Sequence, residues 1–365
     1  MAELPAGDGA AGPPAAAPAG PEARMNMPLV SVIIPMYNAQ AWIYQTLDSL
    51  RGQTYRNLEI IVVDDESSDD GAAIVEAFPD TRVRLIRQKN QGACVARNRG
   101  IEESSGELLQ FLDADDMLGR DKLAVQIERW RELGDNYVYF GPYAHFSSEP
   151  GDIPFRPAGN WRDMSGLDWL IDSWSGDDMM APHAWLTPRR LVDKAGPWHE
   201  KLKQNQDGEY FSRVLLASRG VRFCPAAESF YRIGMTGSIS ASRSRMAIES
   251  RLRSAEMICE RILRRENSPR ARAACANFFE EVKFVSYPLY PELSAKADYW
   301  VEMLGGSSGR QIYRGKVFKM TAPLVGWKLA RTLQWMLRDR RGYQTVRADA
   351  KPDERERKKK GNMIL

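Results

Sequence analysis

The sequence predicts an α/β fold in which a mainly parallel sheet is flanked by helices and followed by a helical C-terminal extension. Short apolar or β-branched runs alternate with amphipathic segments from residue 28 to residue 140. Such alternation is typical of right-handed βαβ units, whose crossover helices cover the faces of a parallel sheet. Two of the apolar runs end abruptly in acids, which predicts a polar site at one edge of that sheet.

The expected elements of the first half follow from hydrophobic periodicity. Strands are predicted at Val30–Pro35, Leu58–Val63, Val83–Ile86, Leu108–Leu112 and Tyr137–Phe140. Helices are predicted at Ala39–Arg51, Ala72–Phe78, Ala93–Ser104 and Arg120–Leu133. Because proline cannot donate to a ladder, we expect Pro35 to end the first strand.

The second half has weaker patterns, especially between residues 141 and 200. Helices are expected at Gly166–Ser173, Pro188–Ala195 and Tyr210–Ser218, and strands at His183–Leu186, Val221–Phe223 and Ser229–Arg232. The stretch from Met246 to Phe284 has helical periodicity. These patterns divide the chain into a disordered leader (1–27), an α/β domain (28–240), a helical extension (241–309) and a basic amphipathic segment with a tail (310–365).

Composition and charge argue against a membrane-spanning, a nucleic-acid-binding or a disulfide-rich protein. The 365 residues can form one large core or two ordinary ones, and no run of 18 or more apolar residues predicts a membrane-spanning helix. The net charge is +3, but residues 310–365 carry +11 and residues 1–309 therefore carry −8. The basic run Arg355–Lys360 is expected to be a tail and not a nucleic-acid patch. The four cysteines lack metal-ligand spacing and a dense disulfide pattern, which favours a reducing, cytoplasmic compartment.

Three acids follow the apolar run that begins at Leu108: Asp113, Asp115 and Asp116. Carboxylates at the carboxyl end of a strand are hard oxygen ligands for Mg²⁺ or Mn²⁺, which in turn hold phosphate oxygens. The alternative is that these aspartates only cap the next helix.

Four motifs resemble those of family-2 glycosyltransferases of the GT-A fold, and they occur in the order found in that family. They are Ser31–Asn38, Ile61–Asp69, Asn90–Gly92 together with Ala96–Gly100, and Phe111–Asp116. A weaker match is Gln206-Asp207 before a helix that contains Arg213. The resemblance covers residues 28–235 and implies that residues 28–240 form a GT-A nucleotide-diphospho-sugar transferase domain.

The resemblance implies a nucleotide-sugar donor, a Mn²⁺ or Mg²⁺ cofactor and inversion at the anomeric carbon by single displacement. Asp65 matches the acid that accepts a hydrogen bond from the donor's base, and an ionised carboxylate suits the imino N–H of uracil or thymine. Pro35, Tyr37 and Asn38 match the loop against which base and ribose rest. The alternatives are an Asx turn at Asp65 and a plain strand-to-helix turn at Asn38.

Asp113 and Asp115 match the Asp-x-Asp motif of the family. Asp115 is expected to bind the metal, and Asp113 to reach the ribose or a metal-bound water. The metal would stabilise the departing nucleoside diphosphate as a Lewis acid. Arg97 is expected to offset diphosphate charge or to hold the nucleotide loop, with an ordinary surface arginine as the alternative. For Asp116, capping of the next helix is the alternative to a place in the site.

Asp207 matches the catalytic base of the family, which stands near the acceptor hydroxyl on the face opposite the leaving group. The family usually has Glu-Asp where this chain has Gln206-Asp207, so the base is retained but the tuning of its pKa is in question. The alternative, an N-cap of the helix at Tyr210, is compatible with catalysis. His183 and Trp185 lie in the half of the family that faces the acceptor, although both residue types are more often structural. Many relatives carry a metal-binding histidine after the segment that ends in Arg232; none stands at Ile233–Ser238, so a third ligand is unassigned.

Residues 310–345 combine basic side chains with tryptophan and leucine. Two interpretations are open. The segment could bind the interface of an anionic membrane, which would suit a lipid-linked acceptor, or it could pack on the catalytic domain and leave a solvated basic tail.

The predicted protein is therefore a metal-dependent inverting glycosyltransferase with a UDP- or dTDP-type donor and a glycan or lipid-linked acceptor. We expect it to act in surface polysaccharide synthesis, peripherally at the inner face of a membrane. One alternative is a sugar nucleotidyltransferase, which would need a glycine-rich basic loop that Pro35–Asn38 lacks. The other is a non-catalytic glycan-binding or scaffold protein, against which the retention of Asp65, Asp113, Asp115 and Asp207 argues.

Overall fold

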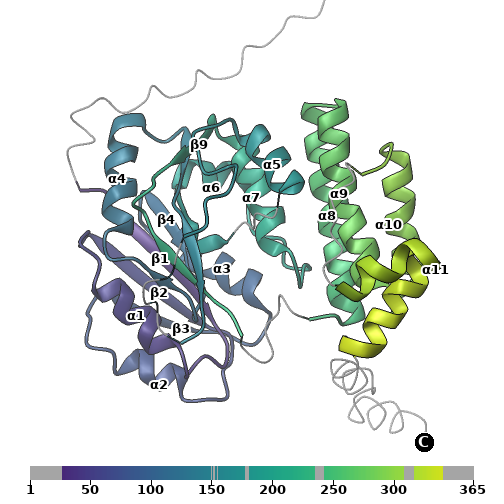
Figure 1. Cartoon of the computed structure of the whole chain (residues 1–365). Helices are drawn as coiled ribbons and strands as arrows, with labels where there is room; N and C mark the ends of the chain where they lie inside the picture. Colours follow the sequence, from purple (N-terminus) through teal and green to yellow (C-terminus); the bar gives the residue numbers. More distant parts are fainter. Residues whose placement is uncertain are drawn as a thin grey trace, which may run out of the picture.

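The computed structural model describes residues 27–148, 150, 153, 155–176, 181–234, 242–307 and 316–339. The leader up to residue 26 and the tail from residue 340 lie outside these ranges, as do residues 310–315. The described chain forms a central sheet covered by helices, with a group of C-terminal helices beside it (Figure 1). The expected α/β fold with a helical C-terminal region is confirmed.

The central sheet has seven strands in the order β3-β2-β1-β4-β8-β6-β9. Its strands are β1 (Val30–Met36), β2 (Leu58–Asp64), β3 (Val83–Arg87), β4 (Leu108–Phe111), β6 (Tyr137–Phe140), β8 (Trp185–Pro188) and β9 (Gly220–Phe223). Neighbouring strands run parallel except at β8, which is antiparallel to both β4 and β6. The sheet is thus mainly parallel, as the alternation of strands and helices predicts.

The helices of this half pack on the sheet to form two large cores and one small apolar cluster. They are α1 (Ile43–Arg51), α2 (Gly71–Glu76), α3 (Ala93–Glu102), α4 (Lys122–Leu133), α5 (Gly166–Ser175), α6 (Arg189–Ala195) and α7 (Gln206–Ala217). Successive residues of a strand point to opposite faces. Ile33 accordingly enters one core, whereas Val32 and Ile34 enter the other. Both faces of β1 are therefore buried, which explains its continuous apolar sequence.

Pro35 does not end the first strand, because β1 continues to Met36 and Pro35 is in register with Val63 of β2. Leu112 donates its amide hydrogen to the Ile33 carbonyl, so alternate residues of β1 face the β4 side. The pairing with β4 stops at Ile33. The nitrogen of Pro35, which carries no hydrogen, therefore points to the β4 side beyond the last paired residue, where no hydrogen bond between the strands is required.

A second, three-stranded sheet lies beside the acidic loop. It consists of β5 (Met117–Leu118), β10 (Ser229–Arg232) and β7 (Tyr143–Phe146), in that order. The strand at Ser229–Arg232 was predicted, but β5 and β7 were not. His183 was predicted to begin a strand and instead lies in a 3₁₀ turn, η2 (Pro182–Ala184), immediately before β8.

The C-terminal region is helical and shares a core with the sheet domain. It contains α8 (Arg245–Arg265), α9 (Pro269–Ser286), α10 (Pro291–Met303), α11 (Lys316–Gln334) and the π-helical turn η4 (Trp335–Asp339). The helical stretch Met246–Phe284 is two helices, since Ser268 caps α9 and Pro269 occupies its first turn. Residues of α8 and α9 belong to the same apolar cluster as residues of α5 and α7.

Within the described residues, no helix is both long enough and apolar enough to cross a membrane. Helix α11 also contains Pro323, and Gly326 interrupts it with a left-handed backbone (φ 78°).

Candidate active site

The candidate site lies where β1, β2 and β4 end. Met36 of β1 is in register with Asp64 of β2, and Ile33 of β1 with Phe111 of β4. The residues that follow each strand therefore meet at one edge of the sheet. This is the edge where open α/β sheets bind ligands, and it brings the first loop, Asp65 and the acidic run together.

The loop after β1 is tied to the loop after β2. Asn38 adopts a left-handed backbone (φ 49°), and its Oδ1 accepts a hydrogen bond of 2.8 Å from the Ser68 amide. Its own amide donates to Ser67 Oγ at 2.9 Å. Tyr37, in contrast, is 56% exposed. Asn38 therefore fixes the shape of this loop, and Tyr37 presents the free aromatic surface on it.

Asp65 is buried and holds the turn that starts α3. Its Oδ1 accepts from Gln88 Nε2 (2.8 Å) and from the Gln91 amide (2.9 Å), and its Oδ2 accepts from the Gly92 amide (2.7 Å). These partners are distant in sequence, so the interpretation as a local Asx turn is wrong. An ionised carboxylate has about four lone-pair directions. Three are used, which leaves one on Oδ2 for a further donor such as the imino group of a base.

Arg97 lies at the centre of the site and is only 4% exposed, so the interpretation as a surface arginine is wrong. Its Nη2 donates to Asp113 Oδ1 at 2.6 Å, and its Nη1 lies 3.9 Å from Asp207 Oδ1. The guanidinium also stacks on the ring of Trp198, 4.4 Å from its centroid. Burial opposes the charge, but Asp113 and Asp207 more than compensate and raise the pKa of Arg97. It therefore stays charged and links the donor side of the site to the proposed base.

The acidic run contains two partly buried carboxylates and one that is completely buried. The Asp113 side chain is 29% exposed, and Asp115 is partly exposed. Burial, together with repulsion from Asp116 and Asp113, raises the pKa of Asp115 to about 8. Asp116 is fully buried. None of these acids caps the following helix, whose N-cap position is Asp121, so the capping interpretation is wrong.

Asp116 instead joins the acidic loop to the rest of the fold. Its Oδ2 lies 2.8 Å from Nδ1 of His183, and its Oδ1 accepts from the Arg232 amide at 2.8 Å. Burial raises the pKa of Asp116 and lowers that of His183 to about 4, so His183 is a neutral imidazole. Its Nε2 has no hydrogen-bond partner in the described part of the chain. His183 therefore holds the acidic loop through its contact with Asp116. Its predicted place on the acceptor side is wrong, because the side chain is completely buried.

Arg232 is a component of the site that the sequence did not reveal. Its Nε donates to the main-chain oxygen of Asp115 at 2.8 Å, while its amide holds Asp116. The guanidinium lies 4.3 Å from the ring centroids of both Trp42 and Phe146. Arg232 thus fixes the backbone from which the Asp115 carboxylate projects. The contact spans more than one hundred residues of sequence, and no local pattern predicts it.

Asp207 lies in the first turn of α7, after Asn205 at the N-cap position, so its interpretation as an N-cap is wrong. The side chain is 36% exposed, but Oδ1 is shielded and accepts no hydrogen bond among the described residues. Burial and the charge of Asp113, opposed by Arg97, raise the pKa of Asp207 to about 7. Gln206, which replaces the usual acid, accepts a hydrogen bond from Arg97 Nη1 (3.1 Å). A carboxylate with this pKa can take and release a proton near neutrality.

Trp185 is not on an acceptor surface. It is completely buried, packs 4.5 Å from Phe140 and 4.9 Å from Trp169 between ring centroids, and belongs to the main core. The prediction that Trp185 faces the acceptor is therefore wrong, because its ring is covered on all sides by other apolar side chains.

The exposed acids fit the divalent cation that the motifs imply, but only with help from a substrate. Magnesium is commonly held by one or two carboxylates, with substrate phosphates and water as the other ligands. Asp115 and Asp113 can supply that number of oxygens. In the described ranges no three His, Cys, Asp or Glu side chains form a metal-binding cluster. The donor set therefore suits a cation that arrives with a diphosphate.

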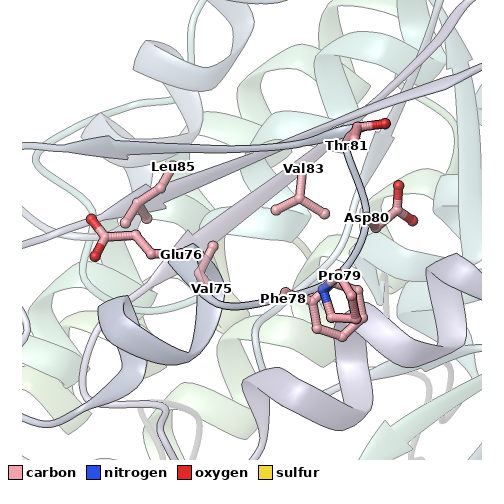
Figure 2. A pocket seen from close by; sticks show the side chains of 8 residues that line it. All are labelled: Val75, Glu76, Phe78, Pro79, Asp80, Thr81, Val83 and Leu85. Carbon is pink, nitrogen blue, oxygen red and sulfur yellow. The ribbon is translucent and has the colours of Figure 1, made fainter.

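A surface pocket of about 410 Å³ lies elsewhere, between α2 and β3 (Figure 2). It contains none of the predicted site residues. Its two acids are already paired, Glu76 with Arg87 at 2.9 Å and Asp80 with Arg82 at 2.6 Å. We assign no function to it.

Similarity to known proteins is found in the part of the chain that forms most of the candidate site. Residues 31–194 match the model of glycosyl transferase family 2. The putative glycosyltransferase EpsH of Bacillus subtilis is 42% identical over 231 residues, which cover 61% of this chain and 66% of EpsH. Glycosyltransferase GlyG of Streptococcus pneumoniae is 34% identical over 172 residues, covering 46% of this chain and 57% of GlyG. An uncharacterized glycosyltransferase of Haemophilus influenzae is 42% identical over 106 residues, or 28% of this chain and 42% of the relative.

Several relatives are much longer than the matched segment: for three Rickettsia glycosyltransferases the match spans 16–21% of the relative's length. Among solved structures, S. aureus TarS 1-349 in complex with UDP-GlcNAc superposes with a TM-score of 0.54 at 17% identity. The match covers 79% of this chain and 94% of that one. At this identity the similarity concerns the fold alone.

Proposed function

We propose that this chain is a metal-dependent, inverting glycosyltransferase, because residues 31–194 match the model of glycosyl transferase family 2. The donor is a nucleotide-sugar of the UDP or dTDP type, and the acceptor is a glycan or a lipid-linked glycan of a surface polysaccharide. The proposal is supported by one relative, the putative teichuronic acid biosynthesis glycosyltransferase TuaG of B. subtilis, and by the TarS complexes with UDP-GlcNAc and UDP.

The observation that carries the proposal is the position of Arg97 between Asp113 and Asp207. One buried cation contacts an acid of the Asp-x-Asp motif at 2.6 Å and lies 3.9 Å from the carboxylate in α7. The donor diphosphate and the acceptor hydroxyl must meet within a few ångströms for direct transfer. A site with donor-binding and proton-accepting groups this close together meets that requirement.

The residues divide the reaction between them. The acceptor oxygen attacks the anomeric carbon while the bond from that carbon to the diphosphate breaks, and the bonding electrons leave with the nucleoside diphosphate. Asp207 takes the proton of the acceptor hydroxyl, for which its raised pKa makes it suitable. Asp65 and the loop at Tyr37 hold the base. A divalent cation bound by Asp115 and Asp113 would neutralise charge on the leaving diphosphate.

The alternative of a sugar nucleotidyltransferase has less support. Such an enzyme needs a flexible, glycine-rich, basic loop to hold the triphosphate of its second substrate. The loop after β1 carries neither glycine nor lysine, and Asn38 fastens it to Ser67 and Ser68.

Calorimetric titration with UDP, dTDP, GDP and CDP, with and without Mn²⁺, tests the donor and metal assignments. We expect tight, metal-dependent binding of UDP or dTDP that is lost in Asp115→Ala. Failure of the folded protein to bind any nucleotide would favour the scaffold interpretation.

Substitution of the base separates binding from chemistry. Asp207→Asn should keep nucleotide binding but reduce transfer by at least about 10²-fold, since general bases contribute 10²–10⁴ to rates. Asp193→Asn, which changes an exposed acid in the same half of the chain, is the matched control and should be fully active. Normal turnover by Asp207→Asn would exclude it as the base.

A further inference from the structure

The surface of α11 and η4 is unusual in the number of large apolar side chains that it exposes. Of the fourteen large apolar side chains exposed in the described residues, seven lie between residues 316 and 339, and they include every exposed leucine. We call six of them the outer face of α11: Met320, Leu324, Leu329, Leu333, Met336 and Leu337. Leu324 is 84% exposed. An exposed apolar surface of this kind marks a site of interaction.

The opposite side of the helix is firmly packed, which fixes the direction in which the outer face points. Phe318 and Ala330 are buried against Phe284 of α9. Arg331 is buried, stacks on the Phe284 ring at 4.4 Å and donates to the Phe284 carbonyl at 3.3 Å. Trp327 contacts the ring of Tyr287 (5.2 Å). The helix therefore docks on α9 by one side and cannot turn its leucines inward without breaking these contacts.

All charged side chains in the sequence of α11 are basic. Residues 316–334 contain four basic residues and no acid, and Lys319 and Lys328 are exposed beside the apolar side chains. The adjoining sequence continues this pattern: residues 310–345 hold nine basic residues and one acid. An apolar face bordered by lysine and arginine is complementary to a layer that is anionic outside and apolar inside.

Two other occupants fit less well. A second copy of the same face would bring basic side chains opposite basic side chains, since an isologous contact pairs a surface with itself. Insertion across a membrane does not fit either, because Pro323 and Gly326 interrupt the helix and no described helix has the apolar length required. A helix that lies along an anionic interface places its basic side chains beside negative charge and does not need the length of a membrane span.

We propose that the outer face of α11 docks the protein on the surface of an anionic membrane, with the leucines toward the acyl chains and the lysines at the phosphate groups. Figure 1 shows α11 at the lower right of the helical region, beside α10 and away from the central sheet. On this proposal the inner side of α11 packs on α9 while the outer side binds lipid, so the two interpretations of the segment do not exclude each other.

Flotation of the full chain with lipid vesicles tests the proposal and requires neither donor nor acceptor. Vesicles of phosphatidylcholine alone are compared with vesicles that contain phosphatidylglycerol, at low and high salt. The wild-type chain should float with the anionic vesicles and be released by salt. The double variant Leu324→Glu/Leu333→Glu should lose at least about tenfold in partitioning, because two apolar contacts are replaced by charges that the lipid repels.

The matched control is Met246→Glu/Met303→Glu, which introduces the same charges at two exposed apolar positions outside α11. It should float like the wild type. Lys319→Glu/Lys328→Glu should weaken binding to anionic vesicles while leaving the thermal unfolding temperature unchanged.

Three results would overturn the proposal. The first is absence of flotation with either vesicle. The second is flotation that the α11 variants do not reduce. The third is a wild-type dimer in sedimentation velocity that Leu324→Glu/Leu333→Glu converts to a monomer without any vesicle binding, since the face would then be a contact between copies. Nucleotide titration of the same samples shows whether the donor site is intact, so a failed donor assignment cannot be confused with a failed docking surface.

Discussion

Arg97 balances the charge of the site at the scale of single residues. It is buried beside two acids and has an aromatic ring beneath it. Without it, Asp113 and Asp207 would face each other with no described cation in hydrogen-bond contact. Loss of one partner from a buried ion pair is costly because the other charge is left unpaired.

Replacement of this arginine should therefore affect both stability and binding. Arg97→Gln is expected to lower the free energy of unfolding by about 1 to 3 kcal/mol, measured by urea denaturation, because Asp113 and Asp207 keep part of their contact with solvent. Arg99→Gln, on the same helix, removes a half-exposed arginine that pairs with Glu103 at 2.6 Å. Exposed pairs contribute little, so this control should cost less than about 1 kcal/mol. Equal effects of the two substitutions would contradict the central role of Arg97.

The raised pKa of Asp207 predicts how the rate of transfer depends on pH. Because the folded protein raises its pKa to about 7, the carboxylate that accepts the proton is lost as the pH falls through 7. The kcat/KM for transfer should thus be constant at high pH and decline with a slope of one proton below neutrality. A profile that stays flat down to pH 5 would show that the group titrates at its ordinary value and does not limit the reaction.

Arg232 should act on the metal and not on the proton. Arg232→Lys keeps the charge but cannot both reach the Asp115 carbonyl and stack between Trp42 and Phe146. We expect weaker Mn²⁺-dependent nucleotide binding, by about tenfold or more as for other groups that orient metal ligands, and an unchanged pH profile. Arg219→Lys, at an exposed position, is the control for titration calorimetry. If both variants bind alike, Arg232 does not position the acidic loop.

The sequence predicted the acids of the candidate site but not the side chains that hold them in place. Asp65, Asp113, Asp115 and Asp207 were found because each belongs to a short contiguous motif. Arg232 and the buried roles of Asp116 and His183 depend on side chains that meet only after folding. Trp185 was misassigned because a tryptophan has the same appearance in a sequence whether it lies in a core or on a sugar-binding surface.

At the scale of elements, α3 carries Arg97 and its distance from the sheet is set by a glycine. A Cβ at Gly100 would lie 2.4 Å from Cγ2 of Ile33 on β1. Alanine is a better helix former by up to about 1 kcal/mol, but overpacking costs about 1 to 3 kcal/mol. We expect the steric cost of the added methyl group to exceed the gain in helix propensity.

Gly100→Ala is therefore expected to lower the thermal unfolding temperature and to weaken nucleotide binding, because α3 must move away from β1. Differential scanning fluorimetry with and without nucleotide measures both. Gly159→Ala adds the same methyl group where no atom lies within 4 Å and should change neither. A more stable Gly100→Ala protein would mean that Ile33 rotates aside at no cost.

The long periodic elements of this half could be predicted from sequence, whereas the shortest could not. β1, β2 and α4 have clear apolar patterns, and each was predicted to within two residues of its ends. β5 has only two residues and exists because β10 pairs with it. Pairing of this kind is a tertiary property, and the local sequence Met117-Leu118 contains no sign of it.

At the scale of the whole molecule, the helical extension is part of the main apolar core. Residues of α8 to α10 share one apolar cluster with β1, β4, α5 and α7. The ring of Trp174 in α5 stacks on Phe278 of α9 at 4.7 Å. The sequence predicted both the α/β half and the helices, but nothing in their periodicity showed that they pack together.

A core substitution far from the strand ends should consequently unfold the whole chain. Phe279→Ala in α9 is expected to cost about 3 to 5 kcal/mol, as for other buried phenylalanines. Unfolding monitored by tryptophan fluorescence and by loss of nucleotide binding should remain a single, coincident transition at lower denaturant. Tyr299→Ala, at a 58% exposed ring, serves as the control. Separate transitions would show that the extension is an independent domain.

The contacts of Asp65 have one more consequence. The same carboxylate that faces the expected base also accepts the amide hydrogens of Gln91 and Gly92, and so fastens the first turn of the helix on which Arg97 stands. In the proposed donor complex, a base bound at Asp65 would therefore be coupled through the backbone to Arg97. Those two amide hydrogens are natural reporters of this coupling: their exchange with deuterium should slow when the correct nucleotide binds and stay unchanged with one whose base Asp65 cannot hold.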